Sequence, residues 1–166
     1  MSAAAGSDGS RVPWAQLSAS GRVDQAARSE AIATIDHRGQ KDKLGVDYIY
    51  HPAAVARPFD PAEQTLEFCA AWLHDVLEDT DITAGDLKLA GVLPEVIEVV
   101  ELLTRREGSG DGDNYYRRIA ENPAARAVKL ADIAHNTEPS RVAQLSPETA
   151  ERLRGKYEHA RKQLGA

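Results

Sequence analysis

Four side chains able to do acid–base or metal chemistry lie close together in the segment AAWLHDVLEDT, residues 70–80. They are His74, Asp75, Glu78 and Asp79, and they stand among large apolar residues. At about 100° per residue they fall at roughly 0°, 100°, 40° and 140° around a helix, so we expect them to share one side of it. Three carboxylates there repel one another unless a positive charge lies among them. The pattern therefore favours a bound cation.

A further acid lies in VKLADIAHN, residues 128–136. Asp132 has apolar neighbours, and an unpaired carboxylate in such surroundings is costly. His51 stands at the start of another expected helix, so three separate helices supply two imidazoles and two carboxylates. This mixed set of nitrogen and oxygen ligands suits Mn²⁺, Fe²⁺ or Zn²⁺. From the residues alone, the alternative is that Asp75 and Asp132 pair with Arg or Lys in a packed bundle.

Chain length, charge and cysteine content limit the classes of protein to consider. The chain has 166 residues, which suits one domain, and its net charge of −6 argues against nucleic acid or an anionic membrane as a partner. One cysteine, Cys69, excludes a disulfide framework and fits a reducing cytoplasm. No apolar run approaches the roughly 18 residues of a membrane span. We expect a cytoplasmic protein, and a homo-oligomer stays open.

Nearly every segment has the pattern of a helix, which predicts a single all-α domain of about seven helices over residues 20–166. Residues 1–19 are expected to form a disordered lead, and GSGDGD a flexible loop. Val23, Ala27, Ala31 and Ile35 follow at steps of four and are expected to face the core. The main helices are expected at 20–38, 62–79, 93–104, 123–136 and 146–165, with shorter ones from Pro52, near 83–91 and near 114–122.

The motifs HDVLEDT and KLADIAHN, with YIYHP upstream, resemble those of the HD-domain metal-dependent phosphohydrolases. More narrowly, they resemble the hydrolase half of the RelA/SpoT alarmone enzymes and the small alarmone hydrolases, over about residues 20–160. The resemblance implies a compact helical HD bundle and a divalent metal, Mn²⁺ in the first place. It assigns the metal ligands to His51, His74, Asp75 and Asp132, the handling of the attacking water to Glu78 and Asp79, and nucleotide contacts to Lys43, Tyr48, Asn136 and Tyr157. His37 would give structural support.

The substrate side of the pattern is less regular. Lys41, Lys43 and the pairs Arg105-Arg106 and Arg117-Arg118 are the expected source of positive potential, and Tyr115-Tyr116 are expected to pack in the bundle. Asp42 stands where the alarmone hydrolases carry Arg, Asp47 where they carry Pro, and residues 137–140 where they continue with Arg and Thr. These departures lie in the expected nucleotide-binding region. We expect that Asp42→Arg, which adds positive charge, strengthens binding of guanosine tetraphosphate.

The sequence thus predicts a metal-dependent phosphohydrolase that removes phosphate or pyrophosphate from a nucleotide, with (p)ppGpp 3′-pyrophosphohydrolase as the leading candidate. One alternative is a phosphatase for another phosphorylated nucleotide or dinucleotide. Another is a non-catalytic nucleotide-binding HD module, against which Glu78 and Asp79 argue. A di-iron oxygenase of the HD type would need further His ligands, and His37, His135 and His159 are poorly spaced for that role.

Overall fold

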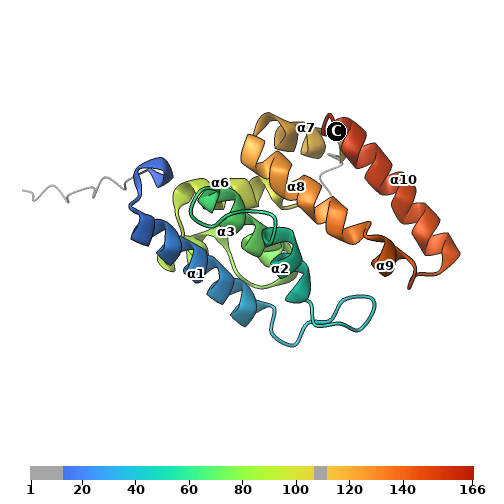
Figure 1. The fold of residues 1–166 in the computed structure, drawn as a ribbon, viewed down its shortest axis with the longest axis horizontal. Helices are drawn as coiled ribbons and strands as arrows, with labels where there is room; N and C mark the ends of the chain where they lie inside the picture. The colour runs from blue at the N-terminus through green and yellow to red at the C-terminus, as the bar shows by residue number, and fades with distance from the viewer. Residues whose placement is uncertain (1–12, 107–111) are drawn as a thin grey trace, which may run out of the picture.

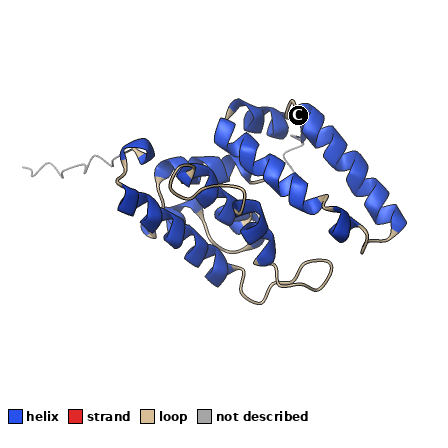
Figure 2. Ribbon diagram, viewed as in Figure 1, coloured by secondary structure: helices blue, strands red, loops and turns tan. Residues whose placement is uncertain are grey.

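The described part of the chain, residues 13–106 and 112–166 of a computed structural model, is built from helices and connecting loops (Figures 1 and 2). It contains no strand, and Lys41 and Asp47 form an isolated bridge. The elements are η1 (Trp14–Gln16), α1 (Ala19–Asp36), α2 (Tyr50–Ala56), α3 (Thr65–Leu73), α4 (Val76–Asp79), α5 (Ala84–Leu89), α6 (Pro94–Leu103), α7 (Gly112–Glu121), α8 (Pro123–Asn136), α9 (Pro139–Val142) and α10 (Pro147–Gln163). The all-α prediction is confirmed.

Helix α3 is the centre of the bundle and contacts α1, α2, α6 and α8 (Figure 1). It has a strongly apolar sequence because neighbours surround it, and Leu73 near its end has no exposed surface. Helix α7 packs against α6 and α8, and α10 packs against α7. This arrangement brings the ends of α2, α3 and α8 together around the motif residues.

Local signals in the sequence explain where several helices begin. Pro123 is the first residue of α8, where its missing N–H needs no partner, and the Asn122 side chain caps the helix by accepting from Ala125 N. Ser146 caps α10 in the same way, through the backbone N–H of Thr149. The expected range 123–136 therefore agrees with α8. Helix α2 begins at Tyr50, slightly before the expected Pro52.

The expected core face of α1 is wrong. Val23 is 56% exposed and Ile35 60% exposed, and the helix instead buries a face containing Ala26, Ser29 and Ala33. Small side chains on that face let α1 approach α3 closely. Its buried Gln25 is satisfied by distant backbone groups, since its side chain donates to Gly91 O and accepts from Leu93 N.

The helix expected over 62–79 is interrupted at the HD motif. Helix α3 ends at Leu73, His74 and Asp75 form a turn, and α4 starts at Val76. Both turn residues keep backbone dihedrals in the right-handed helical region, with φ −59° at His74 and φ −104° at Asp75. The four side chains therefore still lie near one another, although a single continuous helix is the wrong description.

Residues 1–12 of the expected lead, and residues 107–111, which include most of the expected GSGDGD loop, lie outside the described residues. The other residues of the expected lead are folded: Trp14–Gln16 form η1, and α1 begins at Ala19. Arg22 lies over the Trp14 ring, with 5.5 Å between the guanidinium carbon and the ring centroid. The folded region thus starts before residue 20. None of the described helices has the length and apolar character of a membrane span.

Candidate active site

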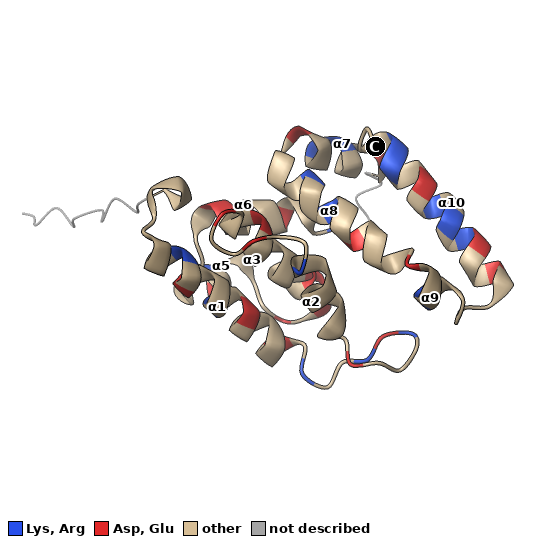
Figure 3. Ribbon diagram, viewed as in Figure 1, with Lys and Arg blue, Asp and Glu red and all other residues tan. Residues whose placement is uncertain are grey.

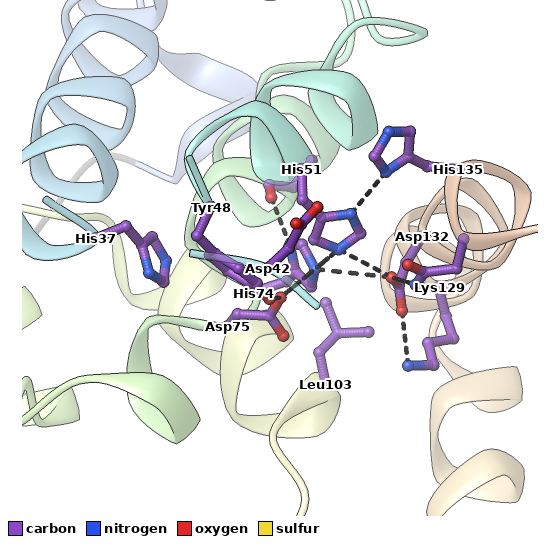
Figure 4. Close-up of polar contacts among 12 residues, drawn as sticks. His37, Asp42, Tyr48, His51, His74, Asp75, Leu103, Lys129, Asp132 and His135 are labelled. Carbon is purple, nitrogen blue, oxygen red and sulfur yellow. Dashed lines mark hydrogen bonds and ion pairs between the residues drawn. The ribbon is translucent and has the colours of Figure 1, made fainter. Parts of the chain in front are cut away.

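Four side chains from three places in the fold converge at the centre of the bundle (Figure 4). His51 comes from the first turn of α2, His74 and Asp75 from the turn between α3 and α4, and Asp132 from α8. His51, His74 and Asp132 are buried. Among the described residues, these three form a group whose ligand atoms all lie within 4.8 Å of one another. The sequence had indicated these residue types, and the packing of α2 and α8 on α3 brings them together.

The spacing of the ligand atoms fits a single bound ion. His51 Nε2 lies 3.2 Å from His74 Nε2 and 3.1 Å from Asp132 Oδ1, and His74 Nε2 lies 3.9 Å from that oxygen. Asp75 Oδ2 is 2.9 Å from His74 Nε2 and 3.6 Å from His51 Nε2. Ligands held about 2.1 Å from one ion at angles of roughly 90° to 140° lie about 3.0 to 3.9 Å apart. The donor set therefore fits a divalent metal.

Hydrogen bonds at the far side of each imidazole orient the side chains of His51 and His74. His74 Nδ1 lies 2.7 Å from Ala71 O and must donate to this carbonyl, so in the neutral ring the lone pair of Nε2 faces the centre. His51 Nδ1 lies 2.7 Å from Nδ1 of His135, on α8. Burial, followed by the charges of His51 and Arg141, lowers the pKa of His135 to about 4, so His135 is neutral and can accept this hydrogen bond. Such partners fix the tautomer of a metal-ligating histidine.

The two carboxylates are also held by neighbours. Asp132 Oδ2 is 2.8 Å from Lys129 Nζ, and its Oδ1 accepts from Asn136 Nδ2 at 2.7 Å. The Tyr48 hydroxyl donates to Asp75 Oδ2. Burial opposes ionisation of both carboxyls, but Lys129 and the histidines outweigh it at Asp132, and His74 outweighs it at Asp75, so both pKa values are lowered. Both groups are carboxylates near neutral pH.

The imidazole of His74 shows that the site attracts positive charge. Burial disfavours its protonated form, yet the carboxylates of Asp75 and Asp132 outweigh burial and raise its pKa to about 9. In the metal-free protein a proton at His74 therefore partly neutralises the two carboxylates. A divalent cation would do the same more completely, because it brings two charges to the place where the proton brings one.

Glu78 and Asp79 lie one turn beyond the HD pair, on the wall of the same cavity. The Glu78 carboxylate accepts from the backbone N–H of Arg105, and the backbone carbonyl of Asp79 accepts from Gln40 Nε2 at 2.8 Å. Burial and the negative charge of Asp75 raise the pKa of both acids, although the Arg105 N–H works against the shift at Glu78. Carboxyl groups with raised pKa values are suited to taking up and returning protons.

These groups line a cavity of about 620 Å³, a size within the roughly 300–1,000 Å³ typical of ligand pockets. Its wall also includes the four residues expected to contact a nucleotide, namely Lys43, Tyr48, Asn136 and Tyr157. Six cationic side chains line it: Lys41, Lys43, Arg105, Lys129, Arg141 and Lys156. The charged residues of α10 and of the loop before α2 are visible in Figure 3. The cavity thus contains the carboxylates of Asp75 and Asp132, while cations come from several surrounding elements.

Only some of the cations that the sequence indicated for substrate binding line the cavity. Lys41, Lys43 and Arg105 line the cavity, whereas Arg106 and the Arg117-Arg118 pair do not. The sequence did not indicate Lys129, Arg141 and Lys156 as cavity residues, because they lie on three different helices and none of them belongs to an adjacent pair of cations. Of these, only Lys129 carried a signal, since it belongs to the KLAD motif.

Tyr115 and Tyr116 are each 5% exposed, as the packing expectation required. Their hydroxyls bond to Leu103 O and Arg105 respectively. His37 is buried and packs against Tyr48, with ring centroids 5.0 Å apart, which agrees with a supporting role. His159 is paired with Asp113 and does not line the cavity.

Asp42 lines the cavity, but Asp47 does not: it pairs with Lys41 and closes the loop before α2. Residues 137–140 are likewise absent from the wall, and the next residue, Arg141, belongs to it. Of the three departures from the alarmone hydrolase pattern, Asp42 alone therefore faces the site.

Comparison with known proteins gives several relatives. No protein-family model matches the chain. It is 30% identical over 125 residues to the guanosine-3′,5′-bis(diphosphate) 3′-pyrophosphohydrolase of Vibrio cholerae, an alignment of 69% of this chain and 18% of the relative. For the protein of the same name from Aquifex aeolicus the identity is 34% over 122 residues, covering 69% and 17%. A GTP pyrophosphokinase of Streptomyces coelicolor is 33% identical over 124 residues, covering 68% and 14%. The chain thus spans less than a fifth of the length of these relatives.

A solved structure agrees with this placement. The structure of a metazoan ortholog of SpoT, described as hydrolysing ppGpp, superposes with a TM-score of 0.69 and 23% identity, covering 84% of this chain and 85% of that one. At this level of identity the match establishes a shared fold. The resemblance to the RelA/SpoT-type HD hydrolases is therefore confirmed in sequence by the bacterial relatives and in fold by the metazoan ortholog.

Proposed function

We propose that this chain is a metal-dependent phosphohydrolase acting on a phosphorylated nucleotide, with (p)ppGpp 3′-pyrophosphohydrolase activity as the leading candidate. The observation that carries the proposal is the pairing of two kinds of group in one cavity. A set of two imidazoles and two carboxylates, of which all but Asp75 are buried, has its ligand atoms at ion-binding distances and lies one helical turn from two acids whose pKa values are raised. The names of the similar pyrophosphohydrolases support the choice of substrate.

His51, His74, Asp75 and Asp132 would hold the divalent ion. A bound ion would supply Lewis-acid polarisation of a phosphoryl oxygen and a water of lowered pKa. Glu78 and Asp79 take up the proton of the attacking water and return it to the leaving oxygen. The Arg105 N–H fixes the Glu78 carboxylate, and the hydroxyl of Tyr48 lies against Asp75 and Asp79. These contacts position the acids toward the phosphate without making them ligands.

The cationic part of the wall supports an anionic substrate on a protein whose net charge is −6. Lys43 and Lys156 would attract phosphate groups at a distance from the metal, and Tyr48, Tyr157 and Asn136 would contact the nucleotide. Asp42 favours keeping a second candidate, a phosphatase for another phosphorylated nucleotide, because this carboxylate faces the cavity. A non-catalytic nucleotide-binding module remains the third reading, and it predicts no turnover.

We propose Mn²⁺ as the metal, because a mixed imidazole and carboxylate set without thiolates suits it. We propose a cytoplasmic location because the one cysteine of the sequence, Cys69, is buried as a free thiol. A homo-oligomer is also proposed, and the exposed Val23 and Ile35 of α1 give an apolar surface that such an assembly would cover. Light scattering at several protein concentrations tests the oligomer.

A panel of phosphorylated nucleotides tests the function. The Mn²⁺-loaded protein is incubated with guanosine 3′,5′-bis(diphosphate), with nucleoside 2′- and 3′-phosphates and with phosphorylated dinucleotides, and the released pyrophosphate and orthophosphate are measured separately. Pyrophosphate released from the tetraphosphate supports the leading candidate. Orthophosphate from another nucleotide supports the second candidate, and the absence of any product contradicts hydrolysis.

A further inference from the structure

The guanidinium of Arg141 lies on the cavity wall opposite the loop that precedes α2. Arg141 belongs to the short helix α9, and its Nη2 lies 3.3 Å from Asp42 Oδ2, an ion pair between residues 99 positions apart. The Arg141 side chain is 25% exposed and the Asp42 side chain 12%. Both residues line the cavity. The pair therefore joins two separate parts of the wall where a ligand would pass.

Asp42 is held in place by its own loop. Its Oδ1 accepts from Leu44 N at 2.8 Å and from Val46 N at 3.0 Å, and its backbone N–H donates to Val46 O at 2.8 Å. Burial opposes ionisation, but these N–H groups and Arg141 outweigh it and lower the pKa of the carboxyl. One oxygen of Asp42 therefore organises the loop, and the other is free to face Arg141.

The contact to Asp42 uses little of the binding capacity of Arg141. A guanidinium has five N–H donors in a planar fork and forms two parallel hydrogen bonds with a phosphate. The distance of 3.3 Å is long for a charge-assisted hydrogen bond, which is usually about 2.7–2.9 Å. Arg141 lines the same cavity as His51, His74, Asp75 and Asp132, so its unused N–H donors are available to a phosphate group that enters this cavity.

We propose that Arg141 is a substrate-binding residue that takes up a phosphate group, and that the Asp42 carboxylate occupies its guanidinium until substrate arrives and displaces it. This inference rests on the proposed function, since it assumes a phosphorylated substrate at the metal site. Substrate phosphate replaces the single long contact to Asp42 with a bidentate one. Asp42 keeps its two loop hydrogen bonds throughout, so the loop remains ordered when Arg141 changes partner.

Other cations of the cavity strengthen the case for an anionic ligand. Burial lowers the pKa of Lys156, and the charges of Arg105, Lys129 and Lys43 lower it further. Like charges that face one another across a cavity are stabilised when an anion enters between them. Arg141 adds a cation on the α9 side of this group.

The same geometry changes the expectation for Asp42→Arg. That substitution removes the acceptor of two loop N–H groups and places a second cation beside Arg141. Loop disorder and repulsion then offset the added attraction for an anion, so we no longer expect tighter binding. Asp42→Asn is the better probe, because its side-chain oxygen can still accept from Leu44 N and Val46 N.

The test is calorimetric binding of two probes, inorganic pyrophosphate and guanosine 3′,5′-bis(diphosphate), to the Mn²⁺-loaded protein. Arg141→Gln should weaken binding about 10- to 100-fold, as expected for the loss of hydrogen bonds to a charged group. Arg141→Lys, which keeps the charge without the fork, should lie between. Asp42→Asn should strengthen binding in the parent and have a smaller effect in an Arg141→Gln background. The control is Arg154→Gln, since Arg154 is 64% exposed, pairs with Glu151 and lies off the cavity wall.

The results separate this inference from the proposed function. Where substrate is turned over, Arg141→Gln should raise KM far more than it lowers kcat, with Mn²⁺ content and helicity unchanged. Probe binding that depends on Arg141 in a protein without hydrolytic activity would support the inference and overturn the proposed hydrolysis. The inference is overturned if Arg141→Gln and Arg141→Lys both bind within twofold of the parent, if Asp42→Asn strengthens binding equally with and without Arg141, or if the parent binds neither probe.

Discussion

Replacing His135 by Ala should weaken metal binding although His135 is not a ligand. The 2.7 Å contact between the Nδ1 atoms of His135 and His51 leaves the Nε2 lone pair of His51 facing the metal position. Removing the acceptor leaves a buried Nδ1–H of His51 unsatisfied, at a cost of about 1–3 kcal/mol. Partners of this kind are typically worth about 10- to 100-fold in metal affinity, which is about 1.4–2.8 kcal/mol. The two ranges overlap between about 1.4 and 2.8 kcal/mol, so we expect a loss of about 10- to 100-fold in metal affinity.

The assay is competition for Mn²⁺ between the protein and a chelator, with circular dichroism to check the fold. His135→Asn should recover part of the affinity, because its side-chain oxygen can stand close to the Nδ1 position and accept the same hydrogen bond. His159→Ala is the matched control, since this histidine is exposed and pairs with Asp113. If His135→Ala binds Mn²⁺ as tightly as the parent, or if His159→Ala loses as much, the reasoning about His51 orientation is refuted.

Three further predictions concern the metal site and the core beneath it. Asp75→Asn should reduce Mn²⁺ affinity by more than His135→Ala does, because it removes the charge of a proposed ligand. Helicity should be preserved, since the Asn side chain still offers an acceptor to Tyr48. Unchanged metal content in the purified variant would contradict the ligand assignment. Mn²⁺ binding near pH 7.5 should release about one proton from His74, because its pKa is raised to about 9. For the same reason, protonation of His74 stabilises the metal-free protein fully below about pH 6.5, and this stabilisation is lost above about pH 9. Calorimetry in buffers of different ionisation enthalpy measures this release, which should disappear above pH 9, and release that does not change with pH would refute it. Leu73→Ala should lower the free energy of unfolding by about 2–5 kcal/mol in denaturant titrations, because the Leu73 side chain is fully buried. A loss below about 1 kcal/mol would contradict the close packing of Leu73 in the core.

Helix positions with local signals were predictable from the sequence. Proline at a first helical position and a polar cap before it mark the start of α8 and α10, and the apolar pattern of α6 marks a buried helix. The buried face of α1 could not be predicted, because Gln25 is buried through partners at Gly91 and Leu93 far along the chain. The break after Leu73 also lacks a local signal, since neither glycine nor proline stands at 74–75.

In the candidate site, too, some residues could be predicted from the sequence and others could not. His51, His74, Asp75 and Asp132 were indicated by short motifs whose residue types carry the chemistry. The pairing of Arg141 with Asp42 and the contact of His135 with His51 depend on how α2, α8 and α9 are placed, and no spacing along the chain shows either contact. The sequence therefore indicated the candidate metal ligands, but not the contacts that orient these side chains or cations of the cavity wall.

Hydrolysis by the parent, compared with Glu78→Gln and Asp79→Asn, tests the central claim most directly. Both substitutions keep shape and remove charge at acids beyond the ligand set, so Mn²⁺ content, helicity and nucleotide binding should stay close to those of the parent. Loss of a positioned acid–base group typically costs about 10²–10⁴ in rate. With Mn²⁺ and guanosine 3′,5′-bis(diphosphate), we predict pyrophosphate release by the parent and release at least about a hundredfold slower by each variant. A parent without turnover on any phosphorylated nucleotide, or variants that hydrolyse at the parent rate, would contradict the account.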